Sequence, residues 1–177
     1  MNFVENYLLN VRFEFERYKE YGDKTFIQLN QKQLHWQSSH NDNSIALIVK
    51  HMVGNMLSRW TNFLTEDGEK QWRNRDAEFD AAPKTKAEIL NLWEEGWNCL
   101  FKALDQLNQN NFDSIIKIRG QKHTVIEAIN RQLAHYSSHV GQIVLLGKLQ
   151  KGEHWNSLTI NKGESKQFNS EMFGKNS

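Results

Sequence analysis

Apolar side chains recur at intervals of three and four residues along most of the chain, and this spacing predicts four long helices. The first covers residues 3–30. Gly22 falls on its apolar stripe without shifting the phase, so we expect one continuous helix with a weak point at the glycine. The second covers residues 44–64 and can be capped by Ser44 or Asn43.

The third and fourth helices each begin with a capping box, in which a threonine is followed three residues later by a glutamate. The motif TKAE starts a helix at residues 85–107, and the motif TVIE starts another at residues 124–150. Lysines and a glycine close the fourth helix, as is common at helix C-termini.

Two polar segments lie outside these helices. Residues 65–84 form a charged loop between the second and third helices, and its segment WRNRDAEF is either a solvated loop, a lid or a dimer contact. Residues 151–177 form a tail whose polar end we expect to be frayed. Little of the chain alternates as strands do. We therefore predict an all-α fold, a four-helix bundle, in a single domain covering residues 1–177 with its core at about 3–150.

Composition restricts the class of protein. The 177 residues include 38% hydrophobic and 24% charged residues, which is usual for a globular protein. The net charge of +1 argues against a nucleic-acid-binding surface. The single cysteine, Cys99, excludes an internal disulfide and is interpreted as a small buried apolar residue. With apolar runs of only a few residues and no signal peptide, we expect a cytoplasmic protein that does not enter a membrane.

Histidines on two of the predicted helices supply the candidate chemistry. His135 and His139 lie one turn apart on the flank of the fourth helix's apolar stripe, and His51 lies on the same kind of flank in the second helix. If the three meet, their neutral imidazoles suit Zn²⁺, and also Ni²⁺, Co²⁺ or Fe²⁺, with a coordination position left open for water or substrate.

The same histidines have a structural alternative. With 7 histidines in 177 residues, a pair at this spacing arises by accident in roughly one sequence in four. The depths also differ in an up-down bundle, where the second and fourth helices run parallel. His51 then lies near the start of its helix while the other two lie in the middle of theirs, unless a crossover connection reverses one helix.

Polar neighbours of the histidines are candidates for supporting roles. Asn55 and Arg59 share the flank of His51 and either support a metal ligand or clamp an anionic substrate; the alternative is a solvated or inter-helix pair. Gln142 lies on the side of His135 and either orients an imidazole or forms a polar edge. The sequence assigns no catalytic base.

Four stretches together resemble one known superfamily. They are NSIALIVKHMVGNMLSRWTNFL at 43–64, DGEKQWRNRDAEF at 67–79, HTVIEAINRQLAHYSSHVGQIVLLGK at 123–148 and HWNSLTINKGESKQFN at 154–169. In order and spacing they resemble the DinB/YfiT-like superfamily of metal-dependent four-helix bundles, and within it a subgroup of bacterial proteins that carry a domain of unknown function.

The resemblance implies a metal site and a class of reaction. Members bind a divalent metal through one histidine of the second helix and an H-x-x-x-H pair of the last helix, here His51, His135 and His139. Their bundle has a non-classical connectivity. Relatives include mycothiol-dependent maleylpyruvate isomerase and bacillithiol S-transferases, which implies a low-molecular-weight thiol cosubstrate, a small-molecule electrophile and a homodimer.

Two functional hypotheses follow from the residues and the resemblance together. The first is a divalent-metal-dependent enzyme, with a thiol S-transferase or related transferase as the expected activity and zinc as the expected metal. The alternative is a metal- or ligand-binding stress-response protein without turnover. A nucleic-acid-binding role is disfavoured by the balanced charge.

Overall fold

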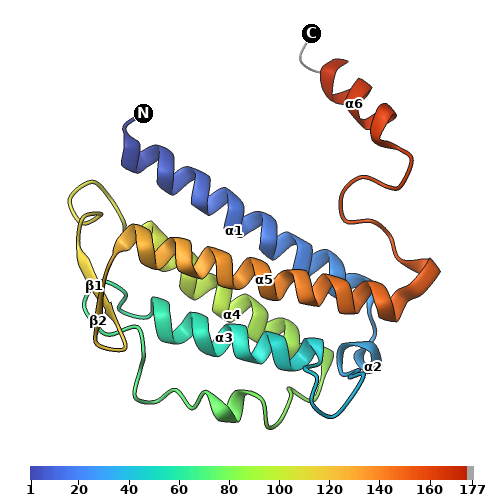
Figure 1. Ribbon diagram of the computed structural model, residues 1–177, viewed down its shortest axis with the longest axis horizontal. Coiled ribbons are helices and arrows are strands. Elements are labelled where there is room, and N and C mark those ends of the chain that lie inside the picture. Colours follow the sequence, from blue (N-terminus) through green and yellow to red (C-terminus); the bar gives the residue numbers. More distant parts are fainter. Residues whose placement is uncertain (175–177) are drawn as a thin grey trace.

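Four long helices dominate the computed structural model, which describes residues 1–174 (Figure 1). Their apolar faces join in one hydrophobic core, which includes Phe15, Trp60, Trp97 and Tyr136. The predominantly helical character agrees with the apolar spacing, and each helix begins within two residues of its predicted start. The long helices are α1 (Phe3–Gln28), α3 (Ile45–Trp60), α4 (Lys86–Asp105) and α5 (Val125–Lys151).

The predicted N-terminal signals form as expected. Ser44 accepts a hydrogen bond from the backbone N–H of Leu47 and caps α3. Both capping boxes are present, at the starts of α4 and α5. These contacts satisfy backbone donors that a helix terminus otherwise leaves unpaired. α3 ends at Trp60, four residues before its predicted end at residue 64, and the residues that follow Trp60 form turns.

The long helices pack as two parallel pairs. α1 runs parallel to α5, because Tyr7 donates to Asn130 near their N-terminal ends and Gln33, just beyond α1, donates to the Gln150 carbonyl at the other end. α3 runs parallel to α4 (Figure 1). Parallel neighbours cannot be joined by a short turn, so residues 61–85 cross the length of the molecule from the end of α3 to the start of α4.

Packing between the pairs brings α3 against α5 in opposite directions. Ile48 lies across a cleft from Leu146, whereas Asn55, two turns later, contacts Tyr136, ten residues earlier in α5. This arrangement is the crossover case, and it removes the depth mismatch of an up-down bundle. The N-terminal part of α3, with His51, lies level with the middle of α5.

Gly22 is a packing position. A Cβ there would lie 2.3 Å from Cζ2 of Trp93, so only glycine lets α1 approach the indole of α4 so closely. The next residue, Asp23, accepts a hydrogen bond of 2.8 Å from Nε1 of Trp93. α1 continues through the glycine, as the unbroken stripe predicts, and the cost of glycine in a helix is offset by this contact.

A small hairpin, which the sequence analysis did not predict, joins α4 to α5. β1 (Ile115–Ile118) pairs antiparallel with β2 (Gln121–Thr124). The two turn residues, Arg119 and Gly120, both have positive φ, as tight hairpin turns require. Asp67 of the crossover accepts hydrogen bonds from both of their backbone N–H groups, at 2.8 and 2.7 Å.

Short helices complete the described chain. α2 (Gln31–Leu34) links α1 to α3, and 3₁₀ turns occur at Asp76–Glu78 and Gly152–His154. In the tail, where a frayed end was expected, Ser165–Gly174 forms α6, which stands away from the four long helices (Figure 1). Within residues 1–174, no helix has both the length and the hydropathy that crossing a membrane requires.

Candidate metal centre

Three imidazoles from two helices meet between α3 and α5, where His51 is buried and the other two are half-buried. His51 comes from α3, and His135 and His139 come from consecutive turns of α5. The ring centroid of His51 lies 5.6 Å from that of His135 and 5.0 Å from that of His139. One ring nitrogen of each histidine falls within 4.8 Å of the others, so the cluster could hold a metal ion.

The spacing of the two α5 nitrogens suits a shared ion. Nε2 of His135 lies 3.0 Å from Nε2 of His139. Two nitrogens bound to zinc at about 2.0–2.1 Å in tetrahedral geometry lie roughly 3.3 Å apart. This edge of the triangle is therefore close to the separation of two ligands of one ion.

Hydrogen bonds fix which nitrogen two of the rings present. Nδ1 of His51 donates to Oε2 of Glu78 at 2.8 Å, and Nδ1 of His139 donates to Oε1 of Gln142 at 2.8 Å. Because a carboxylate and an amide oxygen only accept, each Nδ1 carries the proton and each Nε2 keeps its lone pair. Metal-binding histidines commonly have such a partner on the second nitrogen.

Glu78 is a buried and fixed partner. Arg73 donates to both of its carboxylate oxygens, at 2.7 and 3.1 Å, and the Glu78 residue is only 5% exposed. Burial raises the pKa of the Glu78 carboxyl, but the hydrogen bonds from His51 and Arg73 outweigh it and leave the pKa below its usual value. A Cβ at Gly54 would lie 2.3 Å from Oε1 of Glu78, so glycine at this position allows the carboxylate to approach α3.

An aromatic ring holds the other side of His51. Phe79 stacks on the imidazole with 4.9 Å between ring centroids and 28° between planes. The guanidinium of Arg75 lies 5.7 Å from the Phe79 centroid and covers that ring. His51 is thus held in orientation by a carboxylate and by an aromatic face, both from the crossover segment.

Electrostatics keep the α5 pair in the form that binds metals. Burial lowers the pKa of His135 to about 4, and the neighbouring histidines and arginines add to this effect. Burial also lowers the pKa of His139, against the opposing hydrogen bond from Gln142. Both imidazoles are therefore neutral at neutral pH, which is the protonation state a metal ligand requires.

Asn55 and Arg59 have partners other than the histidines. Asn55 accepts a hydrogen bond of 3.0 Å from the Tyr136 hydroxyl, which in turn accepts one of 3.1 Å from Nε1 of Trp60. Arg59 donates to the Gly68 carbonyl and to Glu69. Both side chains join α3 to neighbouring elements: Asn55 to α5, and Arg59 to the crossover.

Two residues at the site come from the crossover segment WRNRDAEF, which from sequence alone is either a solvated loop, a lid or a dimer contact. Arg73 and Glu78 are not solvated, since their side chains are 2% and 7% exposed. Nothing in the spacing of a loop shows which of its charges is buried. The signal in the sequence that could indicate burial of Glu78 is the aromatic residue Phe79, which follows it directly in a largely polar and charged segment.

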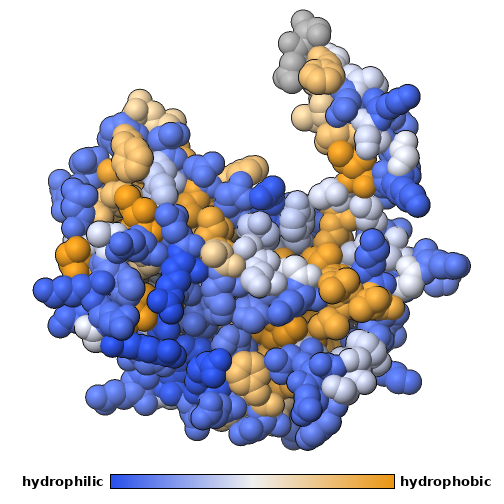
Figure 2. All heavy atoms as spheres, viewed as in Figure 1, coloured by the Kyte–Doolittle hydropathy of each residue, from blue (hydrophilic) through white to orange (hydrophobic). Residues whose placement is uncertain are grey.

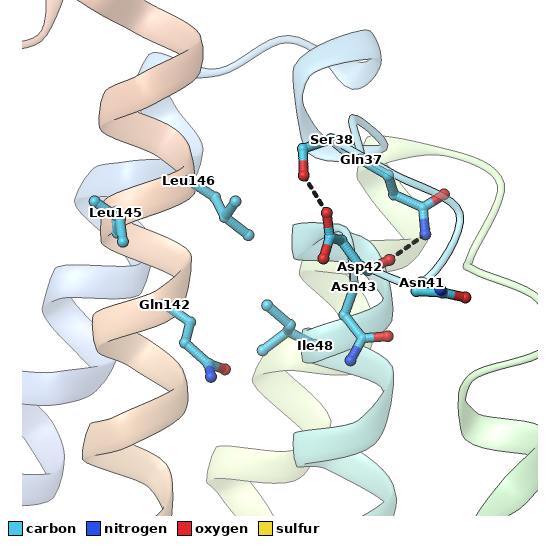
Figure 3. Close-up of a pocket in the computed structure, with 9 residues that line it drawn as sticks. All are labelled: Gln37, Ser38, Asn41, Asp42, Asn43, Ile48, Gln142, Leu145 and Leu146. Atoms are coloured by element: carbon cyan, nitrogen blue, oxygen red, sulfur yellow. Dashed lines mark hydrogen bonds between the residues drawn. The ribbon is translucent and has the colours of Figure 1, made fainter.

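A cleft of about 380 Å³ opens beside the histidines, between α5, the first turns of α3 and the segment that precedes α3 (Figure 3). Gln142, which binds His139, is one of its walls. Ile48 is another, one turn before His51. The cleft therefore begins where the three-histidine cluster ends, on the same helix faces.

The geometry describes a helical protein in which a buried histidine, His51, meets two half-buried ones, His135 and His139, next to a cleft. Residues 2–164 match the model of a family described as a protein of unknown function (DUF1572), and the chain belongs to this family. No curated protein matches the chain, and no solved structure matches it.

Proposed function

We propose that this protein is a divalent-metal-dependent enzyme whose ion is held by His51, His135 and His139, with one coordination position open toward the cleft. The observation that carries the proposal is the orientation of the rings. Two of the three imidazoles have Nδ1 fixed by acceptors and direct Nε2 toward a common region, which is what a metal tripod needs and what a packed core histidine does not.

We further propose that the chain is a four-helix bundle of the DinB-like superfamily. The support is topological. The long helices form two parallel pairs joined by a crossover, and α3 lies antiparallel to α5. This is a non-classical connectivity of the kind the resemblance implies. It also explains how one histidine near the start of α3 reaches a pair in the middle of α5.

The reaction proposed is attack of the sulfur of a low-molecular-weight thiol on an electrophilic carbon of a small molecule. The new S–C bond replaces the bond to a leaving group, which is chloride for monochlorobimane, and the thiol proton is released. A divalent ion with an open position would lower the pKa of a bound thiol and supply a nucleophile at neutral pH. The chain's own residues would orient the site: Glu78 holds His51, Gln142 holds His139, and the adjacent cleft gives room for a small molecule. Three nitrogen ligands favour Zn²⁺, with Ni²⁺, Fe²⁺ or Co²⁺ as the other ions such a set accepts.

Elemental analysis of protein purified without a metal-affinity tag tests the metal site. About one equivalent of a transition metal is expected in the wild type, with loss in His51→Ala and His135→Ala. The matched control is His154→Ala, an exposed histidine outside the cluster, which should keep the metal. Circular dichroism checks that each variant is folded. A wild type that neither contains nor takes up metal would overturn the proposal.

Turnover is tested on the metal-loaded protein with several thiols and monochlorobimane as the electrophile. A rate above the uncatalysed reaction that disappears in His135→Ala supports the transferase. A protein that holds the metal but gives no such rate with any thiol would overturn the transferase and favour the alternative, a metal-binding stress-response protein without turnover.

A further inference from the structure

The cleft between α5 and the segment before α3 has an uneven chemical lining. Its apolar lining comes from both helices, from Leu145 and Leu146 on α5 and from Ile48 on α3, which faces them. The segment before α3 adds amides, hydroxyls and one carboxylate, which are Gln37, Ser38, Asn41, Asp42 and Asn43. Figure 2 shows that apolar surface also gathers on this face over the C-terminal half of α5, where Leu145 and Leu149 are exposed.

Of the described side chains that line the cleft, Asp42 alone carries a formal charge. Hydrogen bonds from the Ser38 and Ser39 hydroxyls lower the pKa of its carboxyl, so it is ionised at neutral pH. Among residues 1–174, no lysine, arginine or histidine lines the cleft. A carboxylate or phosphate on a bound molecule would therefore have no cationic partner in the cleft and would face Asp42.

The polar segment before α3 is held in shape by its own contacts. The Gln37 amide donates to the Asp42 carbonyl (Figure 3). The backbone N–H of Asp42 donates to the Ser39 carbonyl at 3.2 Å. Ser38 and Ser39 both bind the same carboxylate oxygen, Oδ2. The position of the charge is thus set before any ligand arrives, which reduces the ordering cost of binding.

We propose that this cleft binds the substrate of the metal centre and selects small molecules that carry a cationic or neutral polar group beside an apolar chain, against anionic ones. The inference rests on the proposed function. Gln142 links the two sites, because its side chain lines the cleft while its Oε1 accepts from the ligand His139.

Cobalt-substituted protein tests the selection directly. Uptake of Co²⁺ at the three-histidine site is followed first, by its visible absorption. Three thiols with the same six-carbon chain then serve as probes: 6-aminohexane-1-thiol, 6-mercaptohexan-1-ol and 6-mercaptohexanoate. Their binding is read from the sulfur-to-cobalt charge-transfer band. The amine and alcohol should bind more tightly than the carboxylate, the amine by about fivefold or more at low ionic strength, and added salt should reduce this ratio.

Two variants and one control assign the effect to the cleft. Asp42→Asn should abolish the preference for the amine. Leu145→Lys places a cation on the cleft wall and should favour the carboxylate, whereas Leu149→Lys, equally exposed but outside the cleft, should leave the preference unchanged. Leu145 and Leu149 are 58% and 61% exposed, so neither substitution removes core packing.

The outcomes separate the inference from the proposed function. Cobalt binding with equal affinity for the three thiols, or a preference that survives Asp42→Asn, overturns the cleft assignment and leaves the metal centre standing. Absence of cobalt uptake overturns the metal centre, and the cleft assignment falls with it.

Discussion

Replacing Glu78 tests the strongest structural claim about the site, which is that a buried carboxylate from the crossover orients His51. Two substitutions separate its contributions. Glu78→Gln keeps the size and one acceptor oxygen but removes the charge. Glu78→Ala removes both, and leaves Nδ1 of His51 without its partner at 2.8 Å. We expect both variants to weaken metal binding, the alanine variant more.

The contacts set the magnitudes. In Glu78→Ala the Arg73 side chain, 2% exposed, keeps only Glu69 as an acidic partner, at 3.7 Å. Removing one member of a buried ion pair costs about 3–5 kcal/mol in the free energy of unfolding. Loss of an orienting hydrogen bond to a ligand histidine weakens metal affinity by about 10–100-fold. For Glu78→Gln we expect the free energy of unfolding to fall by about 1–3 kcal/mol. We expect its metal affinity to fall by about 10-fold, the lower end of the range given above.

Competition with a chromophoric chelator measures the metal affinity, and urea denaturation of the metal-free protein measures the stability. Glu66→Gln is the matched control, because this carboxylate lies in the same crossover but is exposed and pairs with Lys70. A folded Glu78→Ala variant with wild-type metal affinity would refute the orienting role of Glu78, whatever its stability.

Three further substitutions or conditions have clear expected results. Gly54→Ala should weaken metal affinity, measured by chelator competition, because its Cβ would lie 2.3 Å from the Glu78 carboxylate and displace it. The same clash should lower the free energy of unfolding, measured by urea denaturation, although the better helix propensity of alanine partly offsets this loss. Tyr136→Phe should cost about 1–3 kcal/mol of stability by leaving Nε1 of Trp60 without its acceptor, yet elemental analysis should find the metal content unchanged. For the metal-free protein, the pKa of His135 is about 4 when folded against 6.5 for an ordinary histidine, so the unfolded chain takes up the proton first. The free energy of unfolding should therefore fall as pH drops from about 6.5 toward 4, and urea denaturation at several pH values measures this fall. The free energy should depend less steeply on pH in His135→Ala, and an equally steep dependence would contradict the lowered pKa.

The sequence predicts the helical part of the fold because long amphipathic periodicity and caps are local signals. The starts of α3, α4 and α5 follow from Ser44, Thr85 and Thr124. The hairpin escapes this reasoning because each strand has only four residues, too few to establish alternation. Its turn depends on Asp67, about fifty positions earlier in the chain, which no local pattern reveals.

The site is predictable only in part for the same reason. His135 and His139 share a helix face by spacing alone, and Gln142 follows them on it. Whether His51 lies close to this pair depends on the direction of α3 relative to α5. The chain connectivity sets that direction, and the hydrophobic periodicity of the helices carries no information about it. Glu78 comes from a loop, where no repeat connects sequence position to burial.

A series of ion pairs between acidic and basic side chains extends from the histidines to the hairpin. Glu78 binds Arg73, Arg73 approaches Glu69 at 3.7 Å, and Glu69 accepts from Arg119 at the hairpin turn at 3.1 Å. The inner pair is almost unexposed, with 7% for the Glu78 side chain and 2% for Arg73, whereas Glu69 and Arg119 reach 26% and 55%. Because solvent screens the outer pairs, they contribute little, and the buried Arg73–Glu78 pair contributes most. Through the hydrogen bond between His51 and Glu78, the crossover is fixed to α3 at the three-histidine cluster, so the contacts that hold this long connection in place also orient His51.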